Sequence, residues 1–203
     1  MTTQDINTET LILETARSVF VEKGFDGARM QEIADKAGIN KALLHYYFRS
    51  KQNLFESILN ESIQKIIPHI LEFMESDVPL AKKIESFISS YIDLLIDNPH
   101  IPSFVLHELS RNSDRMSNTI LRTGIDPKGL RYKLAQQIQE ENFIEIEPAQ
   151  LLVNIIALCV FPFIAKPVLQ AVLFDNYPEK YQQFIESRKK EVTHFILKAL
   201  EKS

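Results

Sequence analysis

Apolar residues recur at intervals of three and four positions along almost the whole sequence. The pattern is clearest in segments 12–20, 80–95 and 181–200, where these residues fall on one side of a helix. Glycine accounts for only five of the 203 residues, too few for the many tight turns of a β-sandwich or barrel. The sequence therefore predicts an all-α fold.

Composition narrows the class of protein further. Hydrophobic residues make up 45% and charged residues 25% of the chain, which is typical of a folded globular protein. Cys159 is the only cysteine, so neither an internal disulfide nor a zinc cluster of thiolates is possible. The longest apolar run, 155–164, contains Pro162 and is too short to span a bilayer, and the N-terminal residues are polar. We expect a cytoplasmic protein without a membrane partner.

Turn and capping residues divide the first 60 positions into short helices. Thr8 is a candidate cap for a first helix that Gly24 ends, and Gly38 ends a second helix. Asn40 and Ser50 are candidate caps for the next two helices. Glycine adopts positive φ without steric cost, so Gly38 permits a sharp reversal. This pattern predicts a helix-turn-helix.

Positive charge gathers in the same segment. The chain has a net charge of −4, which argues against non-specific coating of nucleic acid, but residues 36–51 contain no aspartate or glutamate. The helix after the turn has an outward face formed by Lys41, Ala42, His45 and Tyr46. Lysine suits phosphate or guanine, and tyrosine or histidine donates to phosphate or stacks on bases. The segment is therefore a candidate DNA-binding element.

Residues 24–59, GFDGARMQEIADKAGINKALLHYYFRSKQNLFESIL, resemble the DNA-binding domain of TetR-family transcriptional regulators. The shared features, in order and without gaps, are Gly24-Phe25, Ile33-Ala34, Ala37-Gly38-Ile39, Leu44, Tyr47-Phe48, Ser50-Lys51 and Leu54-Phe55. The resemblance implies a three-helix DNA-binding domain at 1–50 and a helical effector-binding and dimerisation domain of about six helices at 51–203. It also implies a homodimer that binds a palindromic operator, joined through its last two long helices, and a small-molecule effector that releases the DNA.

The resemblance also assigns contact positions. The recognition-helix contacts fall on Lys41, Ala42, Leu43, His45, Tyr46 and Tyr47. The lysine that anchors a phosphate falls on Lys51, and the contact at the start of the second helix falls on Arg29. Arg29 stands where the family commonly has threonine, and His45 where it commonly has tyrosine. Both departures keep a phosphate donor but leave the operator sequence open.

The effector site is predicted from residue type alone. Candidate lining residues of the C-terminal domain are Phe87, Tyr91, Phe104, His107, Phe161 and Phe163. These side chains suggest an apolar or aromatic effector, although the same residues would equally fill a closed core. Pro68 and Pro162 are expected to kink or break their helices.

Two alternatives remain open. One is a helical enzyme or small-molecule carrier whose first helices only resemble a DNA-binding motif, and the other is a nucleoid or phage-type helix-turn-helix protein without a ligand switch. No Gly-x-Ser-x-Gly turn supports a nucleophilic triad. We therefore predict a regulator that is not an enzyme, with no catalytic residue, metal or cofactor.

Overall fold

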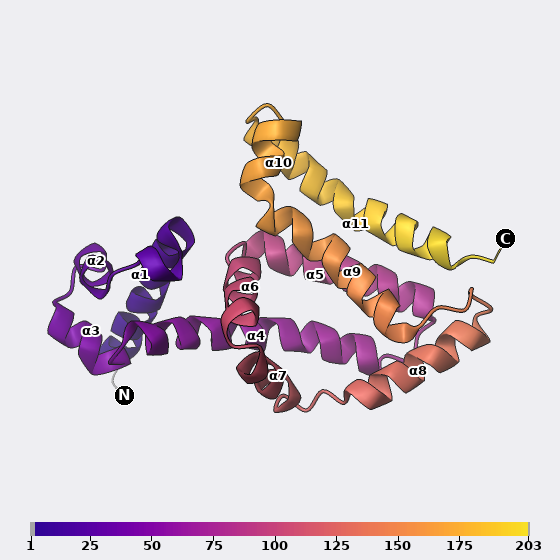
Figure 1. The fold of residues 1–203 in the computed structure, drawn as a ribbon, viewed down its shortest axis with the longest axis horizontal. Coiled ribbons are helices and arrows are strands. Elements are labelled where there is room, and N and C mark those ends of the chain that lie inside the picture. Colours follow the sequence, from indigo (N-terminus) through magenta and orange to yellow (C-terminus); the bar gives the residue numbers. More distant parts are fainter. Residues whose placement is uncertain (1–2, 203) are drawn as a thin grey trace. The chain divides into compact units, whose positions relative to one another are not determined.

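The computed structural model describes the backbone of residues 3–202 and the side chains of residues 8–202, and within this range it contains helices and no strands (Figure 1). The helices are α1 (Thr3–Gly27), α2 (Met30–Lys36), α3 (Lys41–Phe48), α4 (Lys51–Glu75), α5 (Leu80–Asp97), α6 (Ile101–Arg111), α7 (Ser113–Leu121), α8 (Pro127–Glu140), α9 (Pro148–Ile164), α10 (Lys166–Leu173) and α11 (Pro178–Leu200). The predicted all-α fold is confirmed.

Contacts between residues divide the chain into two compact units. The first comprises Met1–Gln64 and Ser103–Arg111, and the second comprises Lys65–Pro102 and Asn112–Ser203. Helices α4 and α6 each contribute residues to both units. This division reflects packing, whereas the proposed boundary between residues 50 and 51 rests on the sequence motif.

The sequence accounts for the helix ends of the first unit. Gly24 has φ of 68° and ψ of 173°, which interrupts the helical backbone of α1, and Gly38 has φ of 66° after α2. The Asn40 side chain accepts a hydrogen bond from the Leu43 amide at 2.8 Å, which caps α3. Ser50 Oγ accepts from the Asn53 amide at 3.1 Å at the start of α4. Both predicted caps are confirmed.

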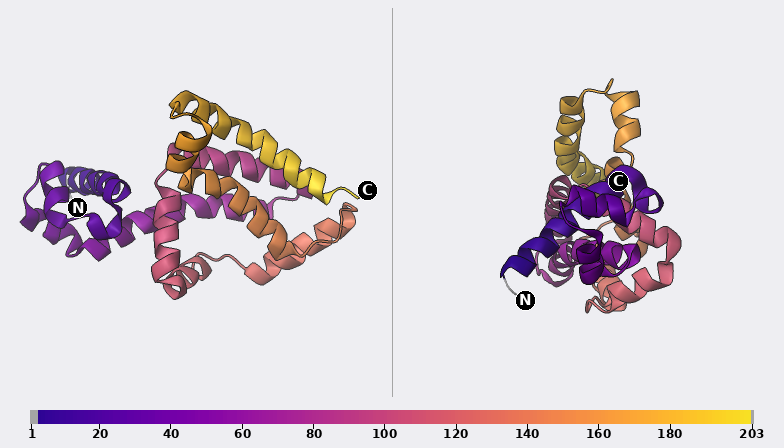
Figure 2. Two further views of the ribbon diagram at one scale, coloured as in Figure 1. Left: turned by 45° about the horizontal axis from the view of Figure 1, so that its top comes forward. Right: turned by 90° about the vertical axis from the view of Figure 1, so that its left-hand side faces the viewer.

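The second unit is built around three packed helices. Helix α5 packs against α9 and α11, and α8 covers α5 and α9; Figure 2 shows α11 in yellow beside α9 in orange. The apolar stripe of α5, from Leu80 to Leu95, is buried as the periodicity predicts. Pro79 is the N-cap residue of α5, and its side chain has no hydrogen-bond acceptor. The carboxylate of Glu141, at the end of α8, accepts hydrogen bonds from the Leu80 and Ala81 amides in its place. A side chain from another helix thus closes the start of α5.

Several helix boundaries differ from the expected ones. Helix α1 begins at Thr3 rather than at a cap on Thr8. Helices α4 and α9 run through Pro68 and Pro162, because a proline removes one N–H and neighbouring turns preserve the rest of the helix. The chain bends by 72° between α9 and α10, next to Ala165 and three residues after Pro162. With α7 and α10 also helical, the described residues 51–202 form eight helices rather than about six.

Within the described residues, no single helix is both long and apolar enough to cross a membrane. Helices α9 and α10 would meet the length and composition criteria only as a pair, across their bend.

Candidate DNA-binding face and effector grooves

The α2–α3 corner fixes which side of α3 is exposed. Leu44 and Phe48 are buried together with Ile33 and Ala34 of α2, as the apolar pattern predicts. The turn between the two helices is closed by hydrogen bonds from the Gly38 amide to the Asp35 carbonyl and from the Ile39 amide to the Ala34 carbonyl. Because one face of α3 is committed to this core, the opposite face is presented outward.

The outward face contains the predicted contact residues of α3. Lys41, Ala42, His45 and Tyr46 are exposed, and Leu43 and Tyr47 are half-buried at its edge. Tyr46 is 79% exposed, with its ring 5.5 Å from that of Tyr47 in an edge-on arrangement. A large aromatic side chain this exposed gains little from packing, which favours a role in recognition.

Two cations of the α2–α3 segment have no partner among the residues that the structure describes. Among the described residues, neither the Lys41 ammonium nor the Arg29 guanidinium forms a hydrogen bond or an ion pair. Arg29 has extended backbone and is the residue before the first turn of α2, which its side chain does not cap. Both charges are therefore available to an anionic ligand such as a phosphate.

His45 is tied to the end of its own helix. Its Nδ1 donates a hydrogen bond to the Arg49 carbonyl at 2.9 Å, because a carbonyl can only accept. In the neutral ring this bond places the proton on Nδ1 and leaves Nε2 as the unprotonated acceptor. The neutral ring therefore presents an acceptor to an incoming ligand rather than a donor.

Lys51 has partners that the sequence did not indicate. Its Nζ donates to the carbonyls of Phe25, Asp26 and Ala28 at 2.7, 3.4 and 3.0 Å. The same ammonium lies 4.6 Å from the centre of the Phe25 ring. The last turn of α1 contains no basic residue that could bind the free carbonyls at the end of the helix. This lack was visible in the sequence and indicated that a cation from elsewhere in the chain would be needed. Lys51 thus caps α1, and its phosphate contact stays a prediction.

The six residues proposed for the effector site do not lie together. Phe104 and His107 belong to the first unit, where their rings lie 4.9 and 5.0 Å from that of Phe55. Tyr91 is buried and stacks on Phe87 at 5.2 Å. Phe161 is 61% exposed, whereas Phe163 is half-buried.

Burial perturbs the titratable groups in the interior of the second unit. It raises the pKa of Tyr91 to about 12 and that of the Cys159 thiol to about 12. Both groups are therefore protonated and unreactive near neutral pH.

An apolar groove of about 310 Å³ lies within the second unit. Of the six proposed residues, only Phe87 lines it. Its lining comprises Ile70, Phe73, Phe87, Ile120, Ile125, Pro127, Leu130, Arg131, Ala149, Leu152, Val153, Ile155 and Ile156. Most of these residues are aliphatic, and eight of the thirteen lie on α8 and α9. The prediction relied on aromatic residue type, which does not single them out.

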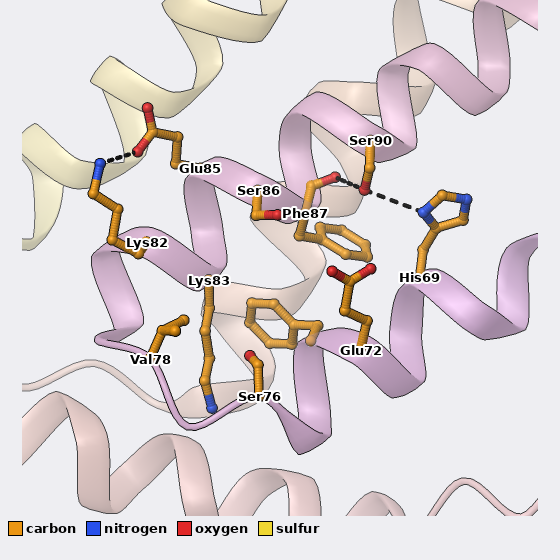
Figure 3. Close-up of a pocket in the computed structure, with 11 residues that line it drawn as sticks. His69, Glu72, Ser76, Val78, Lys82, Lys83, Glu85, Ser86, Phe87 and Ser90 are labelled. Carbon is orange, nitrogen blue, oxygen red and sulfur yellow. Dashed lines mark hydrogen bonds and ion pairs between the residues drawn. The ribbon is translucent and has the colours of Figure 1, made fainter.

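A second groove, of about 450 Å³, lies between α4 and α5 (Figure 3). It shares Phe73 and Phe87 with the apolar groove but has polar walls. His69 Nδ1 and Ser90 Oγ lie 3.1 Å apart on one side, and Lys82 pairs with Glu85 at 2.7 Å on the other. Lys83 is buried, and this burial lowers the pKa of its ammonium.

Comparison with known proteins identifies the first unit. Residues 12–58 match the family model described as bacterial regulatory proteins, tetR family. The chain is 26% identical over 84 residues to the HTH-type transcriptional activator FasR of Mycolicibacterium smegmatis, an alignment that covers 41% of this chain and 38% of FasR. It is 28% identical over 144 residues to the HTH-type transcriptional regulator RutR of Escherichia coli, covering 70% of this chain and 66% of RutR. The chain thus spans less than two thirds of either relative.

A solved structure extends the likeness in fold to both units. The TetR family transcriptional regulator PfmR of Thermus thermophilus matches with a TM-score of 0.69 and 19% identity, over 94% of this chain and 99% of PfmR. At this identity the match shows the fold alone. Residues 12–58 are thus similar to the helix-turn-helix domain described by the tetR family model, and the solved structure shows a similar fold over both units.

Proposed function

We propose that this protein is a transcriptional repressor that binds a palindromic DNA operator as a homodimer and is released by a small-molecule effector. The observation that carries the proposal is the outward face of α3, where Lys41 and Tyr46 are exposed on a helix whose other face is buried. Arg29, which has no partner within the described part of the chain, adds a second cation at the start of α2. Such a face matches the major groove, where phosphate contacts position a helix and base contacts specify the sequence.

The dimer is proposed to form through α9 and α11. Helix α9 has no charged residue from Pro148 to Ile164, and a helix that is apolar on all sides is normally buried on all sides. Yet Val153 and Phe161 are exposed, as is Phe195 on α11, each more than 60%. Two recognition helices bind one operator only when they are about 34–36 Å apart, or a multiple of this distance. A second copy packed on α9 and α11 would bury these side chains and fix that spacing.

Sedimentation of the purified protein tests the dimer. We expect a dimer at micromolar concentration, and we expect Phe195→Glu to shift it towards monomer because a carboxylate would be buried at the interface. Tyr132→Glu is the matched control, since Tyr132 is similarly exposed but lies on α8. A wild-type monomer at these concentrations would exclude this part of the proposal.

The effector is proposed to be apolar or aromatic and to bind the apolar groove. Phe73 and Ile70 of α4 line this groove, and the first residues of the same helix belong to the unit that contains α3. A ligand that moves α4 would change the spacing between the two recognition helices. It must prefer the released state by about 1–3 kcal/mol, or roughly 5- to 150-fold in affinity, to act as a switch.

Genome-wide footprinting with the purified protein would identify the operator and the genes beside it. We expect Lys41→Ala to weaken operator binding and to reduce the slope of log affinity against log salt by about one. Lys128→Ala, an exposed lysine on α8, should leave both unchanged. If Lys41→Ala has no effect on DNA affinity, the assignment of α3 is wrong and a helical small-molecule carrier becomes the better interpretation.

The direction of regulation is tested separately. Transcription from the footprinted promoter should fall when the protein is added, and in the cell this action would place it in the cytoplasm. A rise would make it an activator, the role named for FasR.

A further inference from the structure

His45 and Arg49 are joined by two hydrogen bonds at the end of α3. The Arg49 amide donates to the His45 carbonyl at 2.9 Å, and His45 Nδ1 donates to the Arg49 carbonyl at 2.9 Å. Arg49 has φ of 55° and ψ of −41°, a backbone conformation that residues other than glycine rarely adopt. The first bond extends the helical pattern to Arg49, and the second holds the imidazole against the end of the helix.

The second bond decides what the neutral ring can recognise. A carbonyl only accepts hydrogen bonds, so the single proton of the neutral imidazole lies on Nδ1 and Nε2 carries a lone pair. Nε2 has no partner among the residues that the structure describes, and the His45 side chain is exposed on the outward face of α3. The recognition helix therefore offers one unoccupied acceptor, a single turn away from the cation of Lys41.

An acceptor has few partners on duplex DNA. The anionic phosphate oxygens only accept hydrogen bonds, so they repel the lone pair of Nε2. In the major groove the donors on the base edges are the amino groups, N6 of adenine and N4 of cytosine, whereas guanine and thymine present acceptors and a methyl group. The chemistry of the neutral ring thus matches an amino group and excludes a phosphate.

We propose that His45 reads the amino group of an adenine or a cytosine in the major groove of each operator half-site, with its tautomer set by the Arg49 carbonyl. This inference rests on the proposed DNA-binding function and adds to it the kind of base that α3 reads. It replaces the phosphate contact expected from the sequence at this position, because that contact needs a donor.

A purely structural role for His45 is the competing interpretation. The imidazole satisfies the Arg49 carbonyl at the end of a helix, which a histidine can do without any ligand. That role uses Nδ1 alone, so removing the ring would change stability but not the choice of base. Base preference therefore separates the two interpretations.

Nitrogen NMR of the isotope-labelled full chain tests the tautomer without DNA. At about pH 8, where free imidazoles are neutral, His45 should show a protonated Nδ1 and an unprotonated Nε2. His45→Gln assigns the signals by their loss, and His194 is the comparison, because no hydrogen bond among the described residues fixes its ring. A neutral ring protonated on Nε2 would overturn the proposal.

Base analogues in the footprinted operator test the contact itself. Purine in place of adenine and 2-pyrimidinone in place of cytosine each remove only the amino group. Placed singly along one half-site, one analogue should weaken binding of the wild type by about two- to tenfold, as expected for one neutral hydrogen bond. The same analogue should weaken His45→Ala no more than it weakens DNA pairing itself, because the protein partner is already lost. The analogue that shows this coupling identifies the base.

Variants of α3 separate base reading from phosphate contact. His45→Arg carries donors only, so the preference at that base pair should move to guanine, whose N7 and O6 accept. Lys41→Ala should instead weaken binding to all sequences alike, as the loss of a phosphate contact does. His194→Gln, at an exposed histidine on α11, is the matched control and should leave the preference unchanged.

The other results are also decisive. If every analogue weakens the wild type and His45→Ala equally, His45 reads no amino group and the proposal is wrong. It is also wrong if His45→Ala weakens binding to all sequences alike and lowers the salt slope, since the ring then contacts phosphate. Specific binding that needs Lys41 but not His45 leaves the proposed function intact, whereas the absence of any specific DNA binding removes both.

Discussion

The α2–α3 corner of the first unit and helix α9 of the second use apolar residues differently. At the corner the apolar residues of α3, Leu44 and Phe48, are buried, and the outward face of the helix carries Lys41, His45 and Tyr46. On α9 apolar residues are also exposed, among them Val153 and Phe161, and others line the groove. Position on the apolar stripe therefore indicates burial on α3, but on α9 it does not distinguish core, binding site and subunit interface.

The largest expected effect contrasts two similar apolar residues, one in each unit. Leu44 on α3 is fully buried, so Leu44→Ala should lower the free energy of unfolding by about 2–5 kcal/mol. Ile156 on α9 is 41% exposed beside the groove, and Ile156→Ala should cost less than about 1 kcal/mol. Urea denaturation measures both. Similar losses would show that the α9 stripe is core after all and would remove the contrast.

The next prediction concerns two lysines of the first unit that look alike in the sequence. Lys51→Met removes the donor for three carbonyls at the end of α1 and should lower the free energy of unfolding by about 1–2 kcal/mol. Lys41→Met should leave stability nearly unchanged, because the Lys41 ammonium has no partner among the described residues. Thermal unfolding followed by circular dichroism compares them. A stable Lys51 variant with a reduced salt slope for DNA binding would instead support the phosphate contact.

A smaller effect separates free cations from paired ones. Arg29→Ala should reduce the salt slope of operator binding by about one, as for any lost phosphate contact. Lys36→Ala is the matched control, because Lys36 pairs with Glu22 at 2.9 Å and Glu32 at 3.6 Å. The hydrogen bond to Glu22 raises the pKa of Lys36. The ammonium of Lys36 is therefore already paired within the protein and is less available to a phosphate. Salt titrations by fluorescence anisotropy give both slopes, and equal slopes would mean that pairing does not decide which cations reach DNA.

The smallest effect is a dependence of stability on pH in the first unit. The His107 ring lies beside the rings of Phe25 and Phe55. Its burial lowers the pKa of the imidazole, and the positive charge of Arg111 lowers it further. The negative charges of Asp26 and Glu108 act in the opposite direction. A lowered histidine pKa means that the unfolded chain binds the proton more readily. The contribution of His107 to the free energy of unfolding is therefore fully present above the unfolded pKa of about 6.5, and it is lost as the pH drops below this value.

Removing the imidazole tests this assignment. The difference in melting temperature between about pH 8 and about pH 5.5 should shrink in His107→Phe, which keeps an aromatic ring in the cluster. His194→Phe is the control, because His194 is exposed on α11. An unchanged difference in the His107 variant would assign the pH dependence to other groups.

Spacing along the chain was enough to predict the features that depend on near neighbours. The caps on Asn40 and Ser50, the left-handed Gly38 and the exposed face of α3 each follow from a few adjacent residues. These features act within one or two turns of chain, so spacing is sufficient to predict them.

Contacts between residues far apart in the sequence follow from the packing of the helices and could not be predicted from spacing. Lys51 caps α1 across more than 20 residues, Phe104 joins the first unit, and Arg131 pairs with Glu147. Apolar packing has no direction and polar groups take whichever partner the fold brings near, so residue type does not reveal these contacts. The predicted list of aromatic residues therefore scattered over both units, while the groove formed from aliphatic side chains of several helices.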